Sequence, residues 1–134
     1  MEDCTADNTP FFTFNSPHKI KCKVVSVYDG DTCNIVLKHD CGNYYQWKVR
    51  LFGYNAPEIR PLLKEENRDD IIKNAKEVRD FLMELVLGKI LFIKCSGNGK
   101  YGRVLGELYL NEDDEESVNK VVMDKFNLEF VDYK

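Results

Sequence analysis

The sequence predicts a mixed α+β domain in which five short strands form a small barrel that carries two helices. Three observations predict this class. Apolar residues alternate with polar ones in several short segments, which is typical of strands. In one long segment, and in a short segment near the C-terminus, apolar residues recur at helical spacing. The chain has 134 residues, of which 43% are hydrophobic and 31% are charged, as expected for one globular domain.

The first half of the chain predicts three neighbouring antiparallel strands. Residues 19–28 are rich in β-branched side chains and end at an Asp-Gly turn signal at 29–30. Apolar positions then alternate over 32–38 and over 45–51, and the short segment DCGN at 40–43 connects these two runs. Short connections between alternating runs favour a meander of antiparallel strands.

A long helix is expected after the third strand. Residues 59–68 are polar and predict a loop, after which apolar residues recur at helical spacing from Ile71 to Val86. Gly88 follows the last of them and is a typical residue at a helix end. We therefore predict one amphipathic helix between the third and fourth strands.

The last part of the chain predicts two more strands and a short helix. Residues 90–95 predict a short strand that is buried on both faces, residues 96–100 a flexible turn, and residues 101–110 the fifth strand. Ser117 suits the cap of a helix, and Asn127 can end that helix in a left-handed conformation. Five strands with a helix between the third and fourth are typical of a closed OB-fold barrel, in which the helix fills an open end.

The termini and the cysteines define the expected boundaries and compartment. Residues 1–17 predict a poorly ordered N-terminal arm, and residues 18–134 the folded domain. The sequence shows no signal-peptide pattern and no apolar run long enough for a membrane span. Five cysteines without a CxxC pair favour reduced thiols, most of them in the core, and neither they nor the two histidines have zinc-ligand spacing. We expect an intracellular, cytoplasmic monomer that does not bind membranes.

The overall charge neither supports nor excludes binding to nucleic acid. The chain has 19 basic and 23 acidic residues, which gives a net charge of −4. Five of the acidic residues stand in the run EDDEE at 112–116, which predicts a solvated loop. The rest of the chain has 19 basic against 18 acidic residues, a net charge of +1. The clustering of the basic residues must therefore decide.

The expected strand order brings two short motifs together. In an antiparallel pair, the beginning of one strand lies beside the end of its partner. DGDT at 29–32 should therefore meet NAPE at 55–58 at one edge of the sheet. This places Asp31, Asn55 and Glu58 around one spot.

These residue types suit chemistry on a phosphate ester. Oxygen ligands of this kind bind hard cations such as Ca²⁺ or Mg²⁺, and a carboxylate slightly farther out can activate a water. Arg50, which stands at the end of the third strand, can clamp phosphate oxygens. Taken singly, each motif is more often structural: a turn at DGDT, a salt-bridged Arg50, a loop start at NAPE, or a strand edge at KYGR (100–103). Their occurrence together and in this order favours a functional site.

The order of DGDT, RLxGxxxPE, an amphipathic helix and KYGR resembles the staphylococcal nuclease-like (thermonuclease) family over about residues 19–133. The variant GYNAPEIRP is similar to members carried by large DNA viruses. The resemblance implies a five-stranded OB-fold barrel that hydrolyses phosphodiester bonds in DNA and RNA with Ca²⁺ and leaves 3′-phosphates. We expect single-stranded substrate to be preferred, because a small barrel face must reach around a splayed strand.

The resemblance also implies a role for each site residue. By motif, Asp31, Asn55 and the backbone carbonyl of Ala56 correspond to metal ligands, Glu58 to the carboxylate that orients or deprotonates the attacking water, Arg50 and Arg103 to the arginines that bind the scissile phosphate, and Lys100, Tyr101 and Tyr133 to nucleotide contacts. Both arginines are expected at strand positions of the active face, where their replacement should leave folding intact.

Asn55 departs from the family pattern, which usually has Asp there. An amide oxygen can still coordinate Ca²⁺, but it brings no charge. We therefore expect weaker metal binding, with Mg²⁺ or Mn²⁺ as other ions that the site could take.

Three hypotheses follow, in this order. The first is a metal-dependent nuclease that acts on DNA, RNA or both. The second is a catalytically weak nuclease-like module that binds nucleic acid or a protein, although such modules usually lose the arginines or the base that this chain keeps. The third, a purely structural barrel, gives Arg50, Glu58 and Arg103 no reason to occur together.

Overall fold

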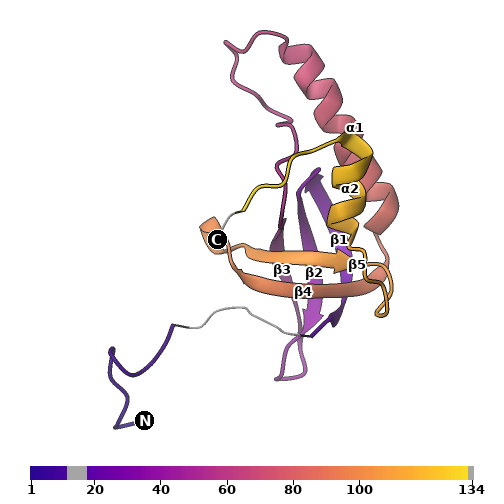
Figure 1. Cartoon of the computed structure of the whole chain (residues 1–134). Coiled ribbons are helices and arrows are strands. Elements are labelled where there is room, and N and C mark those ends of the chain that lie inside the picture. The colour runs from indigo at the N-terminus through magenta and orange to yellow at the C-terminus, as the bar shows by residue number, and fades with distance from the viewer. Residues whose placement is uncertain (12–17, 133–134) are drawn as a thin grey trace.

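The computed structural model describes residues 1–11 and 18–132, except for the side chain of Lys100. In chain order the elements are β1 (Ile20–Asp29), β2 (Thr32–Lys38), β3 (Tyr44–Leu51), α1 (Arg68–Val86), β4 (Ile90–Asn98), the 3₁₀ turn η1 (Lys100–Gly102), β5 (Val104–Tyr109) and α2 (Val118–Phe126). The five predicted strands and both predicted helices are confirmed, and α1 stands between β3 and β4 as expected (Figure 1).

The strands close into a barrel in the order β1-β2-β3-β5-β4. β1, β2 and β3 form the predicted antiparallel meander, and β4 pairs antiparallel with both β1 and β5. A parallel pairing of β3 with β5, from Val49 opposite Val104 to Leu51 opposite Gly106, closes the barrel. This is the arrangement expected for an OB-fold barrel.

The barrel core consists of the inward-facing residues of each strand. Fully or almost fully buried side chains include Val24, Ile35, Val49, Leu91 and Ile93. Cys22, Cys33 and Cys95 are buried among them as free thiols, whereas Cys4 and Cys41 are exposed free thiols. Desolvation by burial, with a further contribution from the charge of Cys95, raises the pKa of Cys22 to about 12, so this thiol stays protonated at neutral pH. The prediction that most of the cysteines are core residues is confirmed.

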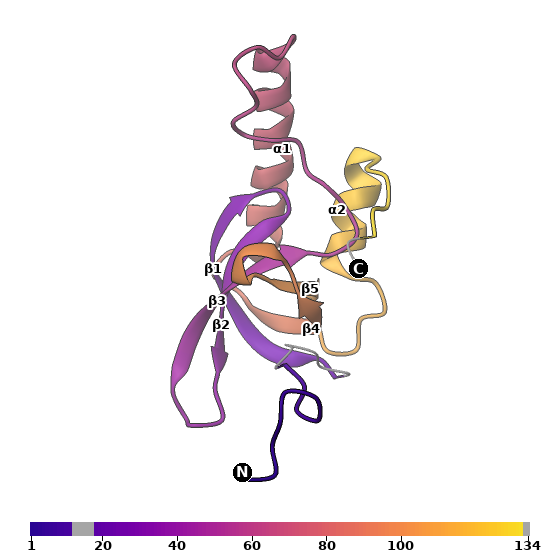
Figure 2. The same cartoon turned by 90° about the vertical axis from the view of Figure 1, so that its left-hand side faces the viewer.

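Helix α1 covers one end of the barrel with its apolar face. Val78, Leu82 and Val86 are buried in the same hydrophobic cluster as the barrel interior. The approach is close at the β1–β2 turn, where a Cβ on Gly30 would overlap the side chain of Val78 and lie 2.8 Å from the Cβ of Ala56. Glycine is therefore required at this position for the helix, the turn and residue 56 to meet. The N-terminal half of α1 extends beyond the barrel (Figures 1 and 2).

Helix α2 lies beside α1, where the Phe81 and Phe126 rings meet edge to face with centroids 5.5 Å apart. The Ser117 side chain accepts a hydrogen bond from the Lys120 N–H, and Asn127 ends the helix in a left-handed conformation, so both predicted caps are confirmed. Asn119, which sequence reasoning missed, is buried. Its amide donates to the carbonyls of Phe52 and Gly106 and accepts from the Leu108 N–H. This fully used amide fixes α2 to the ends of β3 and β5.

Two predicted strands differ in detail from the observed ones. β4 is not buried on both faces, because its side chains alternate and Ile90 is 62% exposed on the outer side. The fifth strand begins at Val104 rather than Tyr101, since Tyr101 has a φ of 61° and Gly102 a φ of 73°, values of the left-handed region rather than the β region. Arg103 therefore precedes β5 instead of standing in a strand.

The described part of the predicted N-terminal arm, residues 1–11, contains no helix or strand and is exposed. Residues 12–17 lie outside the described residues, and the boundary at residue 18 stays a prediction. Within the described residues, neither helix combines the length and the apolar character that crossing a membrane would take.

Candidate functional site

The β1–β2 turn and the end of β3 meet at the end of the barrel next to α1. The β2–β3 register places Thr32 opposite Arg50, and the Leu51 N–H donates to the carbonyl of Asp31 at 2.8 Å. The segment after β3 then folds back onto the turn, where the Ala56 N–H donates to Asp31 Oδ2 at 2.7 Å. The structure thus brings DGDT and NAPE together at one edge, as the strand order predicts.

Arg50 is the centre of this cluster. Its side chain and that of Asp31 are almost completely buried, and Nη2 lies 3.2 Å from Asp31 Oδ2. The same nitrogen donates to Asn55 Oδ1 at 2.6 Å. Nη1 donates to the carbonyls of Leu51 and Tyr54, each at 2.9 Å. Four acceptors from three adjoining segments therefore hold the guanidinium in one orientation.

Asp31 is satisfied on both carboxylate oxygens. Oδ2 accepts from Ala56 and contacts Arg50, and Oδ1 accepts from the Thr32 hydroxyl at 2.9 Å. A carboxylate buried to this extent needs such partners, because an unpaired buried charge is costly. The pairing explains why an aspartate can stand at this position inside the barrel end.

Asp29 is a member of the cluster that sequence reasoning treated only as a turn residue. Its Oδ1 accepts a hydrogen bond from the Asp31 N–H at 3.0 Å. Burial, followed by the hydrogen bond and the negative charge of Asp31, raises the pKa of Asp29 to about 7. The signal was available in DGDT itself, since an aspartate side chain at a turn often accepts a hydrogen bond from the backbone N–H two residues later.

Tyr54 is a second residue that sequence reasoning missed. Its ring is fully buried, its hydroxyl donates to the Gly30 carbonyl, and its own carbonyl accepts from Arg50. Desolvation by burial, and then the charge of Asp31, raises the pKa of this phenol well above its usual value. The uncharged Tyr54 side chain therefore links the β1–β2 turn to the segment that carries Asn55.

Glu58 lies apart from the hydrogen-bonded cluster. Its side chain is exposed in the loop after β3, where it borders a cavity of about 490 Å³ shared with Pro61, Leu62, Glu65 and Ile71. Among the residues that the structure describes, none forms a hydrogen bond or ion pair with Glu58. Its carboxylate is therefore open to solvent and to a ligand.

The KYGR motif borders β3 at the mouth of the barrel. The parallel register of β3 and β5 places Arg103 level with Lys48, two residues before Arg50 along β3. Arg103 is half-buried, and its guanidinium lies 5.9 Å from the centroid of the Tyr101 ring, which is 92% exposed. Lys100 belongs to η1, but its side chain lies outside the described part, as does all of Tyr133.

The oxygens of Asp31 and Asn55 are of a type that binds hard cations, but they are directed at Arg50. Both face one cationic atom, Arg50 Nη2, which lies within hydrogen-bond distance or close to it. Carboxylate and amide oxygens are common ligands of Ca²⁺ and Mg²⁺. No group of three or more His, Cys, Asp or Glu side chains suited to a metal occurs in the described ranges. A metal here would therefore depend on few charged ligands and would share them with Arg50.

A model of the staphylococcal nuclease homologue family matches residues 48–126 of the chain. The match begins inside β3, ends with α2 and covers more than half of the sequence. It includes Arg50, Asn55, Glu58 and Arg103, whereas DGDT precedes it. A comparison with curated proteins gave no match.

The burial of Arg50 changes the expected outcome of its replacement. Arg50→Ala would leave the Asp31 carboxylate and two carbonyls without their donor, so we expect a loss of about 3 kcal/mol in the free energy of unfolding. Arg103→Ala, at a half-buried position before β5, should cost less than about 1 kcal/mol. Urea unfolding of both variants measures the difference. Equal stabilities would contradict the structural role given to Arg50.

Asp29 predicts a decline of stability with rising pH. Its pKa in the folded protein, about 7, lies above the ordinary value of 3.8. Between these values the folded state binds more protons than the unfolded state, so stability falls as the pH rises and then levels off. Asp29→Asn keeps an oxygen that can accept from Asp31 and removes the titration. Thermal unfolding in EDTA at several pH values should show a smaller decline for the variant, and a constant offset from the wild type would refute this assignment.

Proposed function

This chain belongs to the staphylococcal nuclease homologue family, and we propose that it is a metal-dependent nuclease. The proposed reaction is hydrolysis of phosphodiester bonds in DNA, RNA or both, with single strands preferred and 3′-phosphates as products. The observation that carries the proposal is the buried guanidinium of Arg50, held by Asp31, Asn55 and two carbonyls at the mouth of the barrel.

Arg50 supports phosphate chemistry because its orientation is set before a ligand arrives. Hydrolysis of a phosphodiester places additional negative charge on the phosphorus oxygens, and a fixed donor stabilises that charge without reorganisation. In the unbound protein, Nη2 contacts the neutral oxygen of Asn55 and the carboxylate of Asp31. We infer that a phosphate displaces the Asn55 oxygen from Nη2, since an anion is the stronger acceptor. Asn55 would then keep its oxygen for a cation.

Asp31, Asn55 and the Ala56 carbonyl are the residues that would hold the metal. The structure fixes the N–H of Ala56 against Asp31, and the role of its carbonyl remains a prediction. When bound, a Ca²⁺, Mg²⁺ or Mn²⁺ ion would supply positive charge for the phosphate oxygens and would favour ionisation of a water. With only one carboxylate in this set, we expect weaker binding than two carboxylates would give.

Glu58 and Arg103 complete the proposed site from the two sides of the cluster. The carboxylate of Glu58, which is exposed and has no partner among the described residues, would orient the attacking water and accept its proton. The guanidinium of Arg103 would bind the phosphate from the β5 side, next to the exposed ring of Tyr101. Lys100, Tyr101 and Tyr133 keep their proposed roles as nucleotide contacts.

Two observations favour a second candidate, a module that binds nucleic acid without cleaving it. The Nη atoms of Arg50 are already paired with acceptors of the chain, and the metal set contains a single carboxylate. Such a module would bind a single strand with Arg103 and Tyr101 but release no product. Direct assay of cleavage separates the two candidates.

We expect cleavage of single-stranded DNA or RNA in the presence of Ca²⁺, Mg²⁺ or Mn²⁺, slower cleavage of duplex DNA, and none in excess EDTA. Gel analysis of end-labelled substrates would show 3′-phosphate ends. Glu58→Gln is the matched control, since it keeps size and hydrogen bonding but cannot accept a proton. It should bind the strand as the wild type does and lose turnover by a factor on the order of 10²–10⁴. Undiminished cleavage in EDTA would refute the metal assignment, and binding without product in every ion would establish the second candidate.

Asn55→Asp is expected to strengthen the metal site at nearly constant volume. The new carboxylate would face the same region as Asp31, so the Ca²⁺ concentration for half-maximal cleavage should fall and Ca²⁺ should stabilise the variant more than the wild type. If Asn55 adapts the site to Mg²⁺ or Mn²⁺, the variant should instead shift its preference toward Ca²⁺ without a higher peak rate. Calorimetric titration and cleavage rates distinguish these results. If neither affinity nor preference changes, Asn55 does not contact the metal.

A further inference from the structure

A group of exposed lysines lies on the outer side of strands β1, β2 and β3. Along β1, Cys22 and Val24 face inward, so Lys21 and Lys23 face outward. By the same alternation, Lys38 of β2 and Lys48 of β3 are exposed on the outer side. We call these four lysines, with Tyr44, the lysine face: Lys21, Lys23, Lys38, Lys48 and Tyr44.

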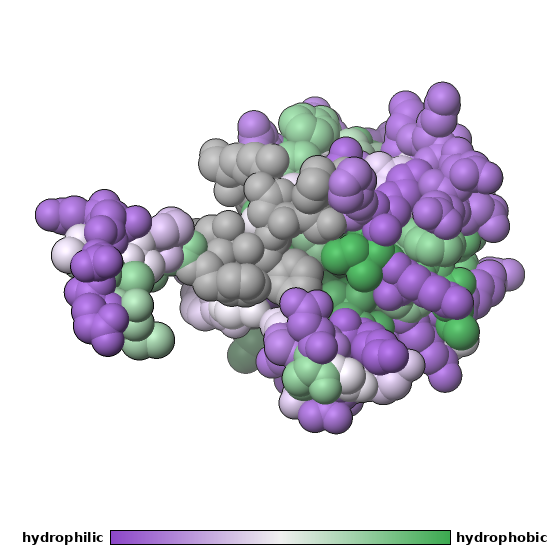
Figure 3. Space-filling view, turned by 90° about the horizontal axis from the view of Figure 1, so that it is seen from below, coloured by the Kyte–Doolittle hydropathy of each residue, from purple (hydrophilic) through white to green (hydrophobic). Residues whose placement is uncertain are grey.

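The strand register places these residues next to one another. Lys23 pairs with Val36, Lys38 pairs with Tyr44, and Asn34 pairs with Lys48. Lys21, Lys23, Lys38 and Tyr44 border a cavity of about 570 Å³, whose apolar lining includes Ile20, Val36 and Ile90. Seen from the side of the β2–β3 hairpin, hydrophobic surface is flanked by hydrophilic side chains (Figure 3). The hollow therefore joins an apolar floor to a cationic rim.

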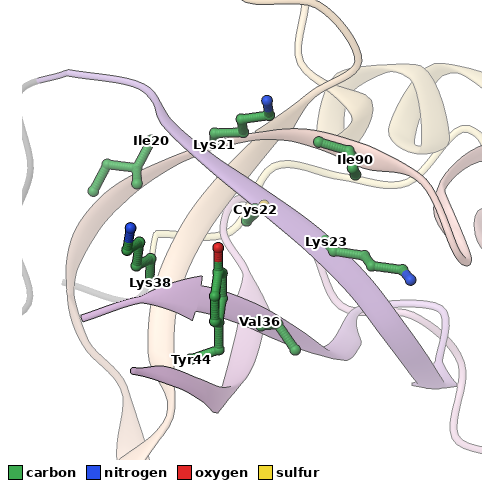
Figure 4. A pocket seen from close by; sticks show the side chains of 8 residues that line it. All are labelled: Ile20, Lys21, Cys22, Lys23, Val36, Lys38, Tyr44 and Ile90. Atoms are coloured by element: carbon green, nitrogen blue, oxygen red, sulfur yellow. The ribbon is translucent and has the colours of Figure 1, made fainter. Parts of the chain in front are cut away.

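Tyr44 projects as a flat wall of this hollow. Its side chain stands beside Val36, with Lys38 on one side and Lys23 on the other (Figure 4). The residue is 68% exposed. An aromatic ring left this open beside apolar side chains offers a stacking surface for another flat ring.

The positive charge of the lysine face is separated from most acidic residues of the chain, although Asp40 stands two residues after Lys38 in the β2–β3 turn. None of its four lysine side chains forms an ion pair or a hydrogen bond with the residues that the structure describes. β2 and β3 contain no Asp or Glu, and the only acidic residue of β1 is Asp29 at its far end. This separation occurs in a chain whose net charge is −4. An anionic ligand would therefore be attracted to this surface in particular.

The outer side of β3 connects the lysine face to the candidate site. Alternation places Tyr44, Gln46, Lys48 and Arg50 on the same side of that strand, and Arg50 alone among them is buried. Six residues of a strand span roughly 20 Å. A single strand of several nucleotides could follow this line and contact both places, since OB folds bind about 4–16 nucleotides.

We propose that the lysine face binds the single-stranded nucleic acid that extends from the candidate active site. The lysines contact its phosphates, and Tyr44 stacks on a base next to the apolar floor of the hollow. A single strand suits the surface better than a duplex, because only unpaired bases present a free face to Tyr44. This inference rests on the proposed function for the position of the cleaved bond, but the binding itself does not require cleavage.

The test measures binding of a fluorescent oligothymidylate of about 15 nucleotides in EDTA by anisotropy, at several salt concentrations. The double variant Lys23→Gln/Lys38→Gln should weaken binding about tenfold and reduce the slope of log K against log salt by about 1.4, or about 0.7 per lost phosphate contact. Tyr44→Ala should weaken binding by about tenfold. The matched control Lys73→Gln/Lys76→Gln removes the same charge from exposed positions of α1 and should change affinity less than about twofold.

Cleavage of a dinucleotide substrate separates this inference from the proposed function. Such a substrate is too short to reach Lys23, Lys38 or Tyr44, so its cleavage rate should be the same in the wild type and in all these variants. If the variants cleave the dinucleotide and bind the long strand as the wild type does, the proposed role of the lysine face is overturned and the proposed nuclease activity stands. If the wild type binds the long strand, the lysine-face variants weaken that binding, and no substrate is cleaved, the proposed role of the lysine face is supported and the proposed nuclease activity is overturned. The inference would be overturned if the α1 control variant weakened binding of the oligonucleotide equally. It would also be overturned if an acidic peptide bound as tightly as the oligonucleotide and with an affinity that Tyr44→Ala left unchanged.

Discussion

The buried contact between Arg50 and Asp31 is the interaction on which the organisation of the candidate site depends. It joins the β1–β2 turn to the end of β3, and the same guanidinium holds Asn55 and the carbonyls of Leu51 and Tyr54. Burying a cation and an anion is favourable only when nearly all of their hydrogen-bonding capacity is met, and here both are surrounded by partners. The chain after β3 is therefore fixed where it can carry ligating oxygens.

The same contact constrains how the site can work. An arginine whose guanidinium is held by acceptors of its own chain is preorganised. A phosphate that binds to it must replace at least one of those acceptors. The neutral amide of Asn55 makes that exchange easier than a carboxylate would, while it also lowers the charge offered to a metal. In the proposed reaction, a lower ligand charge and an easier release of Arg50 would both follow from the Asn55 side chain. Such a coupling would link the asparagine at residue 55 to the binding of the proposed substrate.

Charge is distributed unevenly over the molecule, which matters more than its net value. The candidate site combines Asp29 and Asp31 with Arg50, whereas the lysine face is cationic and the EDDEE run at 112–116 is acidic. Lysines on separate strands become one surface only because the barrel register aligns them. A polyanion approaching such a protein is guided by the local surface, since exposed charges beyond about 10 Å are screened at moderate salt.

The sequence by itself determined the strands and helices, the OB-fold order and the meeting of DGDT with NAPE, because apolar periodicity and antiparallel pairing follow from local backbone geometry. The two wrong strand predictions also have local causes. The positive φ of Tyr101 makes β5 begin later than predicted, and apolar residues on the outer side of β4 hid the alternation of buried and exposed positions in that strand. Only the tertiary structure decided that Arg50 is buried against Asp31 and Asn55, and that four lysines form one face. Those outcomes depend on which residues of distant segments meet when the barrel closes, and no periodicity along the chain encodes such contacts.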